Sequence, residues 1–265
     1  MKRLIVILAV AVALGAFADG APAPKKKISR EKLRETIRKV QAKKTGGIVR
    51  KEGSAKGTFV VVNAQRRVSE SDLAPVAETL GQWMHVQAKV VSAEAGSVDA
   101  KAAKAAISKA GGVLGVAVVE GDGPTLLVAP EDGWALVDAA ALAKDGADAK
   151  TLAARVRKEA LRAFAFVSGG AYMARGEPLM RDVKSVKDLD AVASEQFGID
   201  TVVHVRESAA FYGLTPWQQA TYLKACEQGW APAPTNEYQK AIWDKVHEMP
   251  AEPIKIKPET KKVKE

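Results

Sequence analysis

The residue types that carry most enzyme chemistry are sparse and scattered along this chain of 265 residues. His85, His204 and His247 are its three histidines, and no two of them stand at a spacing typical of metal ligands. Cys226 is the only cysteine, and a lone thiol is more often a small buried side chain than a nucleophile. Neither a Gly-x-Ser-x-Gly elbow nor a phosphate-binding loop occurs. The sequence therefore predicts no nucleophilic triad, no cofactor and no bound metal.

One continuous segment, residues 158–190, has the spacing of a known catalytic motif. It reads KEALRAFAFVSGGAYMARGEPLMRDVKSVKDLD and resembles the active-site stretch of the archaemetzincins, a branch of the metzincin zinc proteases. In that family a helix carries His-Glu-x-x-His, a glycine turns the chain, a third histidine completes the zinc site, and a Met-turn lies beneath the metal. The positions that match here are Lys158, Glu159, Ala160, Gly169, Leu179, Met180, Ser185, Asp188 and Asp190.

The metal-binding side chains of that motif are replaced in this chain. The three ligand positions hold Arg162, Phe166 and Tyr172, and the position of the general-base glutamate holds Ala163. A catalytic zinc needs imidazole or carboxylate ligands and an open position for water, and an arginine side chain repels a dication. The resemblance therefore implies a protease frame without zinc, and the sequence favours a protein that is not an enzyme.

The leading functional hypothesis is an exported, non-catalytic pseudopeptidase that binds a peptide or an anionic ligand in the relict cleft. This cleft would lie between the strands of 124–138 and the helix that ends near Gly169. Arg162, Tyr172 and Arg175 would line it and contact the ligand.

Two other hypotheses remain open. An enzyme could use other acid–base or nucleophilic groups, which are Glu159, Asp188, Asp190, His204 and Cys226. Structural roles compete with this one, since Glu159 and Arg162 can form a helix pair and the aspartates can cap a helix. The third hypothesis is a structural protein of the cell envelope, whose Lys-rich arms touch an anionic surface.

The elements that must position these residues are predicted from periodicity and turn signals. Strands are expected at 58–63, 86–92, 113–119, 125–129 and 134–137, and helices at 69–84, 98–110 and 149–167. This order predicts an α/β fold, with a mixed twisted sheet and flanking helices like that of a metzincin.

The C-terminal third differs in character. Thr215 and Pro216 favour a helix start, that helix would stop at Gly229, and Asn236 would begin a last helix. Three of the five tryptophans lie in 217–243. We expect a helical, Trp-rich clasp that packs on the α/β domain.

The two ends of the chain are expected to lie outside the folded body. Residues 1–18 have a positive start, an apolar run and a small-x-small site, which predicts a cleavable signal peptide and a secreted or periplasmic location. No later segment is apolar enough to span a membrane. The net charge of +9 is concentrated in two arms, 25–44 and 255–265, so a nucleic-acid partner is not expected. The expected partner is a peptide or an anionic envelope component.

These observations divide the chain into five expected parts. They are a signal peptide (1–18), a basic leader and helix (19–47), a metzincin-like domain (48–192), a helical C-terminal region (193–254) and a Lys-rich tail (255–265).

Overall fold

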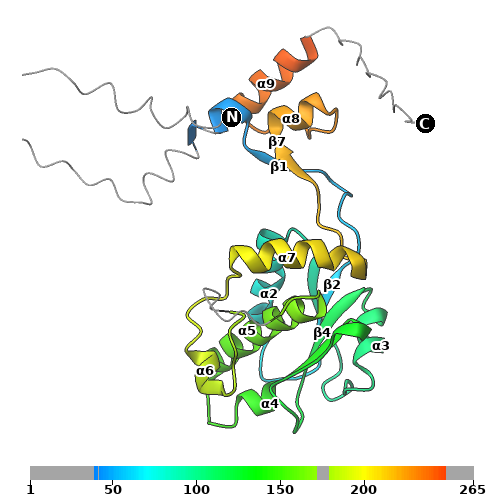
Figure 1. Ribbon diagram of the computed structural model, residues 1–265, viewed down its shortest axis with the longest axis vertical. Helices are drawn as coiled ribbons and strands as arrows, with labels where there is room; N and C mark the ends of the chain where they lie inside the picture. The colour runs from blue at the N-terminus through cyan, green and yellow to red at the C-terminus, as the bar shows by residue number, and fades with distance from the viewer. Residues whose placement is uncertain (1–38, 41, 172–178, 249–265) are drawn as a thin grey trace, which may run out of the picture.

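The structure is a computed structural model that describes residues 39–40, 42–171 and 179–248. Figure 1 shows two units in this part of the chain, joined by a pair of extended segments. The larger unit is an α/β domain, and the smaller unit is built from the N-terminal and C-terminal described residues. The predicted signal peptide and Lys-rich tail lie outside the described residues.

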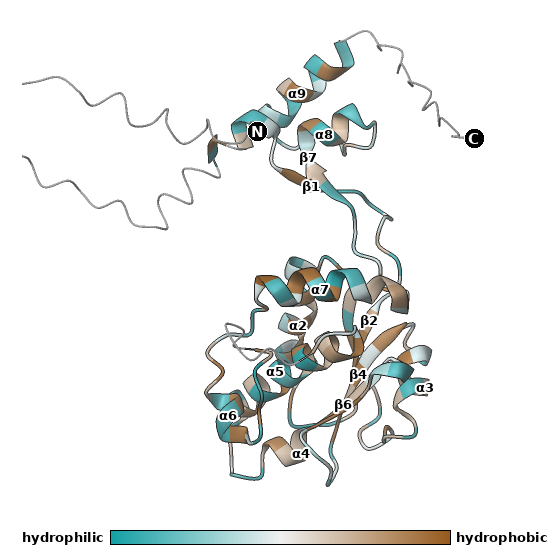
Figure 2. Cartoon of the chain, in the orientation of Figure 1, coloured by the Kyte–Doolittle hydropathy of each residue, from teal (hydrophilic) through white to brown (hydrophobic). Residues whose placement is uncertain are grey.

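A five-stranded sheet with the order β3-β2-β4-β6-β5 forms the centre of the larger unit. Its strands are β2 (Phe59–Asn63), β3 (Ala88–Ser92), β4 (Leu114–Val119), β5 (Leu126–Ala129) and β6 (Trp134–Asp138). The pairs β2–β3, β2–β4 and β4–β6 are parallel, and β5 pairs with β6 in the antiparallel sense. Figure 2 shows apolar residues along β4 and β6 at the centre of this unit. The prediction of a mixed α/β sheet with flanking helices is confirmed.

Helices cover both faces of this sheet. The first face carries α2 (Glu70–Thr79), its π-helical continuation η2 (Leu80–Met84) and α5 (Ala149–Val167), and the second carries α3 (Ala103–Lys109). Central strands β2 and β4 are buried along their whole length, as apolar β-branched runs covered on both faces should be. Gly115 lets α3 approach β4, because a Cβ there would lie 2.8 Å from an Ile107 methyl carbon.

Shorter elements complete the larger unit. They are η3 (Pro130–Asp132), α4 (Ala139–Leu142), α6 (Val186–Asp190), α7 (Ile199–Ala209) and η4 (Ala210–Tyr212). The apolar side chains of α7, including Val202 and Val205, belong to the same buried cluster as α2 and α5. No helix among the described residues combines the length and the apolar character needed to cross a bilayer.

The smaller unit joins segments that are far apart in sequence. Its elements are β1 (Ile48–Arg50), β7 (Gln219–Thr221), α8 (Tyr222–Glu227) and α9 (Glu237–Glu248). Strands β1 and β7 pair in the antiparallel sense. Tyr222 is fully buried against Gly46, whose φ of +70° suits glycine, and a Cβ on Gly46 would lie 2.7 Å from the Tyr222 Cβ. Gln239 Nε2 donates a hydrogen bond to Gly46 O and ties α9 to the N-terminal segment.

This division differs from the single clasp expected for 193–254. Helix α7 packs on the α/β domain, whereas β7, α8 and α9 lie with β1 in the smaller unit (Figure 1). The helix predicted from Thr215 begins only at Tyr222, because Gln219–Thr221 form β7 and pair with β1. Thr221 is the N-cap, and its hydroxyl accepts the Lys224 N–H.

Candidate functional site

Arg162, an expected ligand contact, is buried inside the α/β domain with 1% of its surface exposed. Its Nε donates to Glu159 Oε2 at 2.9 Å, and its Nη1 donates to Leu179 O at 2.7 Å and to Arg181 O at 2.8 Å. The predicted i,i+3 pair of Glu159 and Arg162 is therefore confirmed. The prediction that Arg162 lines an open cleft is wrong, because its guanidinium joins α5 to the 179–181 segment within the core.

The surroundings of this pair are apolar. Burial raises the pKa of Glu159, while the charge and hydrogen bond of Arg162 act in the opposite direction. The guanidinium carbon of Arg162 lies 5.8 Å from the centroid of the Phe166 ring. Ala163 and Met180 are fully buried, so these predicted positions do form one cluster, but they form it as core.

Gly169, Tyr172 and Arg175 are the other expected members of this site. Helix α5 ends at Val167, and Gly169 follows it with a φ of +86°, as a glycine at a helix C-terminus often does. Tyr172 and Arg175 lie outside the described residues.

A zinc ion does not fit the residues that the structure describes here. Phe166 has no lone pair, and Nε and Nη1 of Arg162 donate to Glu159 and to two carbonyl oxygens. Within the described ranges, no three His, Cys, Asp or Glu side chains gather as a metal site would require. No catalytic step through a metal is therefore derived.

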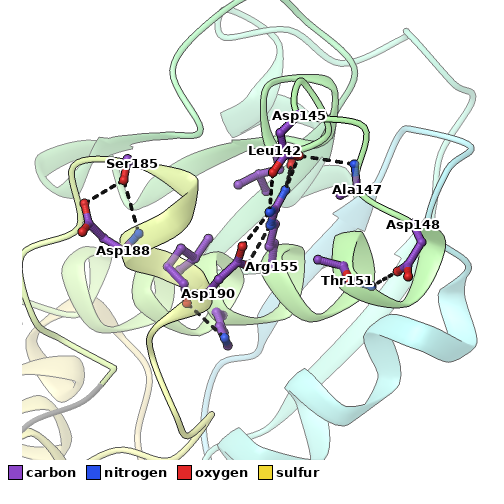
Figure 3. Close-up of polar contacts among 11 residues, drawn as sticks. Leu142, Asp145, Ala147, Asp148, Thr151, Arg155, Ser185, Asp188 and Asp190 are labelled. Atoms are coloured by element: carbon purple, nitrogen blue, oxygen red, sulfur yellow. Dashed lines mark hydrogen bonds and ion pairs between the residues drawn. The ribbon is translucent and has the colours of Figure 1, made fainter.

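A second buried arginine on α5 holds the short helices in place (Figure 3). Arg155 donates to Asp145 Oδ2 at 2.7 Å, to Asp190 Oδ2 at 2.6 Å and to Leu142 O at 2.6 Å. It thereby connects the end of α4 with α5 and α6. Hydrogen bonding to Arg155 lowers the pKa of Asp145 to about 2 and also lowers the pKa of Asp190.

The sequence analysis missed Arg155, although a signal for it exists. Arg155, Glu159, Arg162 and Phe166 follow at spacings of four, three and four residues, so they share one face of a helix. All four are buried, beside the apolar stripe of α5. Charged residues repeated in this way on one face of a helix indicate interior ion pairs, once other elements are known to cover that face.

The remaining acid–base candidates stand in separate settings. Asp188 Oδ2 accepts from the Ser185 hydroxyl, and Ser185 is the N-cap of α6. His204 Nε2 lies 3.0 Å from Gly169 O. Cys226 is buried in the smaller unit, and burial raises the pKa of its thiol, so the reactive thiolate is scarce at neutral pH. The structure does not bring these groups together as one acid–base site.

Surface hollows lie elsewhere, along the edge strand β3. The α3-side hollow has a volume of about 740 Å³, and its lining includes Val62, Lys89, Val91, Glu94, Ala102, Ala106 and Lys109. The α2-side hollow has a volume of about 410 Å³, and its lining includes Ala77, Gly81, Val86, Ala88, Lys89 and Trp217. No sequence signal identified these hollows, because they depend on which strand lies at the edge.

Trp217 fixes the connection between the two units beside the α2-side hollow. Its backbone N–H donates to His85 O at 2.8 Å, its ring stacks on the His85 ring with centroids 6.3 Å apart, and the Arg50 guanidinium carbon lies 4.3 Å from the centroid of the Trp217 ring. Arg206 Nη2 lies 3.0 Å from His85 Nε2, which must accept because arginine has no acceptor. Burial lowers the pKa of His85, and the charges of Arg206 and Arg50 lower it further.

Comparison with known proteins gives matches in structure only. No protein-family model and no curated protein matches the chain. A zinc-dependent peptidase from Methanocorpusculum labreanum is similar at 15% identity, with a TM-score of 0.43 over 56% of this chain and 100% of that one. An archaemetzincin from Methanopyrus kandleri is similar at 16% identity, with a TM-score of 0.47 over 60% of this chain and 98% of that one.

The second of these structures bears the name of the group that residues 158–190 resemble. Both structures go against the leading functional hypothesis, since one of the two proteins is described as a zinc-dependent peptidase and the other as an archaemetzincin. The expectation of a non-catalytic pseudopeptidase with a ligand in a relict cleft is therefore contradicted and is not carried further.

Proposed function

We propose that this protein binds an extended polypeptide segment, which adds a strand to the open edge of β3. One observation carries the proposal: β3 pairs with β2 on one side only, and a hollow flanks it on each face of the sheet. Strand addition at a sheet edge is a recurring mode of peptide recognition, in which backbone hydrogen bonds provide affinity and side-chain pockets provide specificity.

The backbone groups that would bind the segment can be named. Gln87 O accepts from Phe59 N, and Ala93 N donates to Asn63 O, so odd-numbered residues of β3 face β2. The N–H and C=O groups of the even-numbered residues 88, 90 and 92 therefore face outward, and none of them has a backbone partner among the described residues. These three outward positions, at alternate residues, suffice to bind a short strand.

The side chains of an added strand would enter both hollows. Successive side chains of a strand point to opposite faces of a sheet. Ala88 and Val90 pack toward the α2 and α5 face, and Val91 packs toward the α3 face. A segment beside β3 would therefore place alternate side chains in the α2-side hollow and in the α3-side hollow.

Lys89 also supports a competing role at this edge. An exposed lysine on an edge strand discourages pairing with another apolar strand and so protects against aggregation. The half-buried Val90 and Val91 and the two hollows favour a ligand site, because protection alone requires no side-chain pockets. A single lysine disfavours pairing with an unspecific apolar strand, but it still allows a negatively charged segment to bind.

The proposal also covers residues 158–190, which resemble the archaemetzincin motif: we propose that this motif binds no metal here. The buried donors of Arg162 support it, because they occupy the place where a metal ligand would be needed. Zinc content by elemental analysis of the purified protein tests this part separately.

A matched pair of proline variants tests the strand addition. Val90→Pro removes one outward N–H from β3, and Val128→Pro removes one from β5 at the opposite edge. Val128 faces outward because Asp138 N donates to Thr125 O and bonded pairs alternate along an antiparallel ladder. Proline is tolerated at such positions, and circular dichroism would check that both variants fold.

The readout is fluorescence anisotropy of a library of labelled eight-residue peptides, with product analysis for cleavage in the presence and absence of zinc. Binding, or any cleavage, should fall at least tenfold in Val90→Pro and stay within twofold of the parent in Val128→Pro. Equal effects of the two variants, or no peptide that binds, would overturn the proposal.

A further inference from the structure

We propose that the segment bound at β3 carries an acidic and a basic side chain four residues apart, with an apolar residue midway between them. This inference rests on the proposed strand addition and names the class of segment that the α3-side hollow accepts. The pattern follows from the charges at the two ends of the hollow and from the apolar floor between them.

The first end of the hollow is positive. Lys89 stands near the start of β3, and Lys109 is the last residue of α3. The Lys89 ammonium lies 3.7 Å from the position that a Cβ on Gly111 would take, just beyond the end of α3. Both lysines are exposed, and neither has an ion partner among the described residues. A carboxylate placed here would face two cations.

The second end of the hollow is negative. Glu94 lies two residues after Ser92, the last residue of β3, and Ala102, which also lines this hollow, directly precedes α3. Glu94 is exposed, and no ion pair forms with it in the part of the chain that the structure describes. A basic side chain is favoured here, so the hollow has a direction of charge along the strand.

Between these ends the floor is apolar. Val62 and Val91 come from the sheet, and Ala102 and Ala106 come from the side of α3. An apolar side chain that covers them loses contact with water, which stabilises the complex by roughly 25 cal/mol per Å² buried. The floor therefore favours an apolar residue opposite Val91.

Strand geometry sets the spacing. Residues i, i+2 and i+4 of an extended segment share one face and span about 13 Å at 3.3 Å per residue. Lys89 and Val91 have this spacing on β3, and Ala93 and Glu94 follow its last residue, Ser92. A parallel segment would read Glu-x-Φ-x-Lys, where Φ is apolar, and an antiparallel segment would read Lys-x-Φ-x-Glu.

The test compares two eight-residue peptides of equal composition, one for each order of charge, by anisotropy at 50 mM and 500 mM salt. We expect one order to bind at least tenfold more tightly, with the difference reduced at high salt because exposed ion pairs are screened. Which order binds identifies the direction of the added strand.

Charge reversal provides the decisive variant. Lys89→Glu, Lys109→Glu and Glu94→Lys together reverse every charge that lines the α3-side hollow. The preferred peptide order should invert in this variant. The control variant combines Lys187→Glu, Lys224→Glu and Glu207→Lys. These substitutions reverse two exposed lysines and one exposed glutamate that line neither hollow, so the control should keep the parent's preference.

The outcomes separate this inference from the function on which it rests. Tight binding of both orders with no inversion would overturn the charge pattern and leave strand addition standing. Loss of all peptide binding would overturn both. Self-association that disappears in Val90→Pro would show that a second copy of the chain occupies the edge, and that result also overturns the inference.

Discussion

Two regions of the larger unit both combine charge with apolar surroundings, and they differ in what satisfies the charge. On α5, Glu159 and Arg162 satisfy one another and two backbone carbonyls, and both are almost fully buried. At the β3 edge, Lys89 and Glu94 line a hollow and are exposed. The α5 interior is complete in itself, whereas the edge offers unpaired backbone and charge to something else. The completeness of the pairing, rather than residue type, therefore distinguishes the interior pair from the edge that we propose as a binding site.

The largest effect should come from breaking the α5 pair. Glu159→Met leaves the Arg162 charge buried without its partner, which should lower the free energy of unfolding by about 3–5 kcal/mol. The double variant Glu159→Met with Arg162→Met removes both charges and should be less destabilised than the single variant. Urea unfolding of the parent, the single variants Glu159→Met and Arg162→Met, and the double variant measures this. If the double variant loses as much free energy of unfolding as the two single variants together, the pair does not act as a unit.

A smaller effect is expected at Arg155, because its partners reach water. Asp145 and Asp190 keep 43% and 40% of their side-chain surface exposed, so they can be hydrated when the arginine is lost. Arg155→Met should lower the free energy of unfolding by about 1–3 kcal/mol, mainly through the lost hydrogen bonds.

The acid profile of this variant provides a second readout. Both aspartates have lowered pKa values in the fold, so their contribution is present above about pH 4 and is lost as the pH falls toward 2. The free energy of unfolding of Arg155→Met should therefore fall less than that of the parent when the pH is lowered from 4 to 2. An unchanged acid profile would contradict the assignment of these pKa shifts to Arg155.

The smallest effect is expected beside the β3 edge, at His85. Its pKa is lowered in the fold, so the unfolded chain binds the proton more readily and stability falls as the pH drops below about 6.5. His85→Asn should flatten this slope, and asparagine tolerates the left-handed φ of 59° at this position. Thermal unfolding at pH 7.5 and pH 5.5 measures the slope. The Arg155→Met variant is the control and should keep the slope of the parent, because the aspartates that it affects titrate at lower pH.

Local patterns were sufficient for most of the fold. The helix predicted over 149–167 coincides with α5, because one stripe of apolar residues repeats at helical spacing between Asp148 and a glycine turn. Strand 58–63 is found because its β-branched run is buried on both faces. The α5 ion pair was also foreseen as a structural alternative, since its members are three residues apart.

Non-local pairing explains what the sequence could not predict. Arg155 binds Asp145 and Asp190, which are ten and 35 residues away, and no local signal selects them. The open edge of β3 depends on the order of the strands, in which β2 lies beside β4, and β4 beside β6, although neither pair is consecutive in sequence. The helix predicted at Thr215 was displaced because β7 pairs with a strand near the other end of the chain.

The pairing of β1 with β7 has a consequence for how the protein is made. The partner of β1 emerges from the ribosome roughly 170 residues later, which is about 10–30 s at ordinary rates of synthesis. All five strands of the central sheet are translated within that interval. The larger unit can therefore assemble first, while β1 waits as an unpaired strand that nascent-chain chaperones would encounter before its partner does.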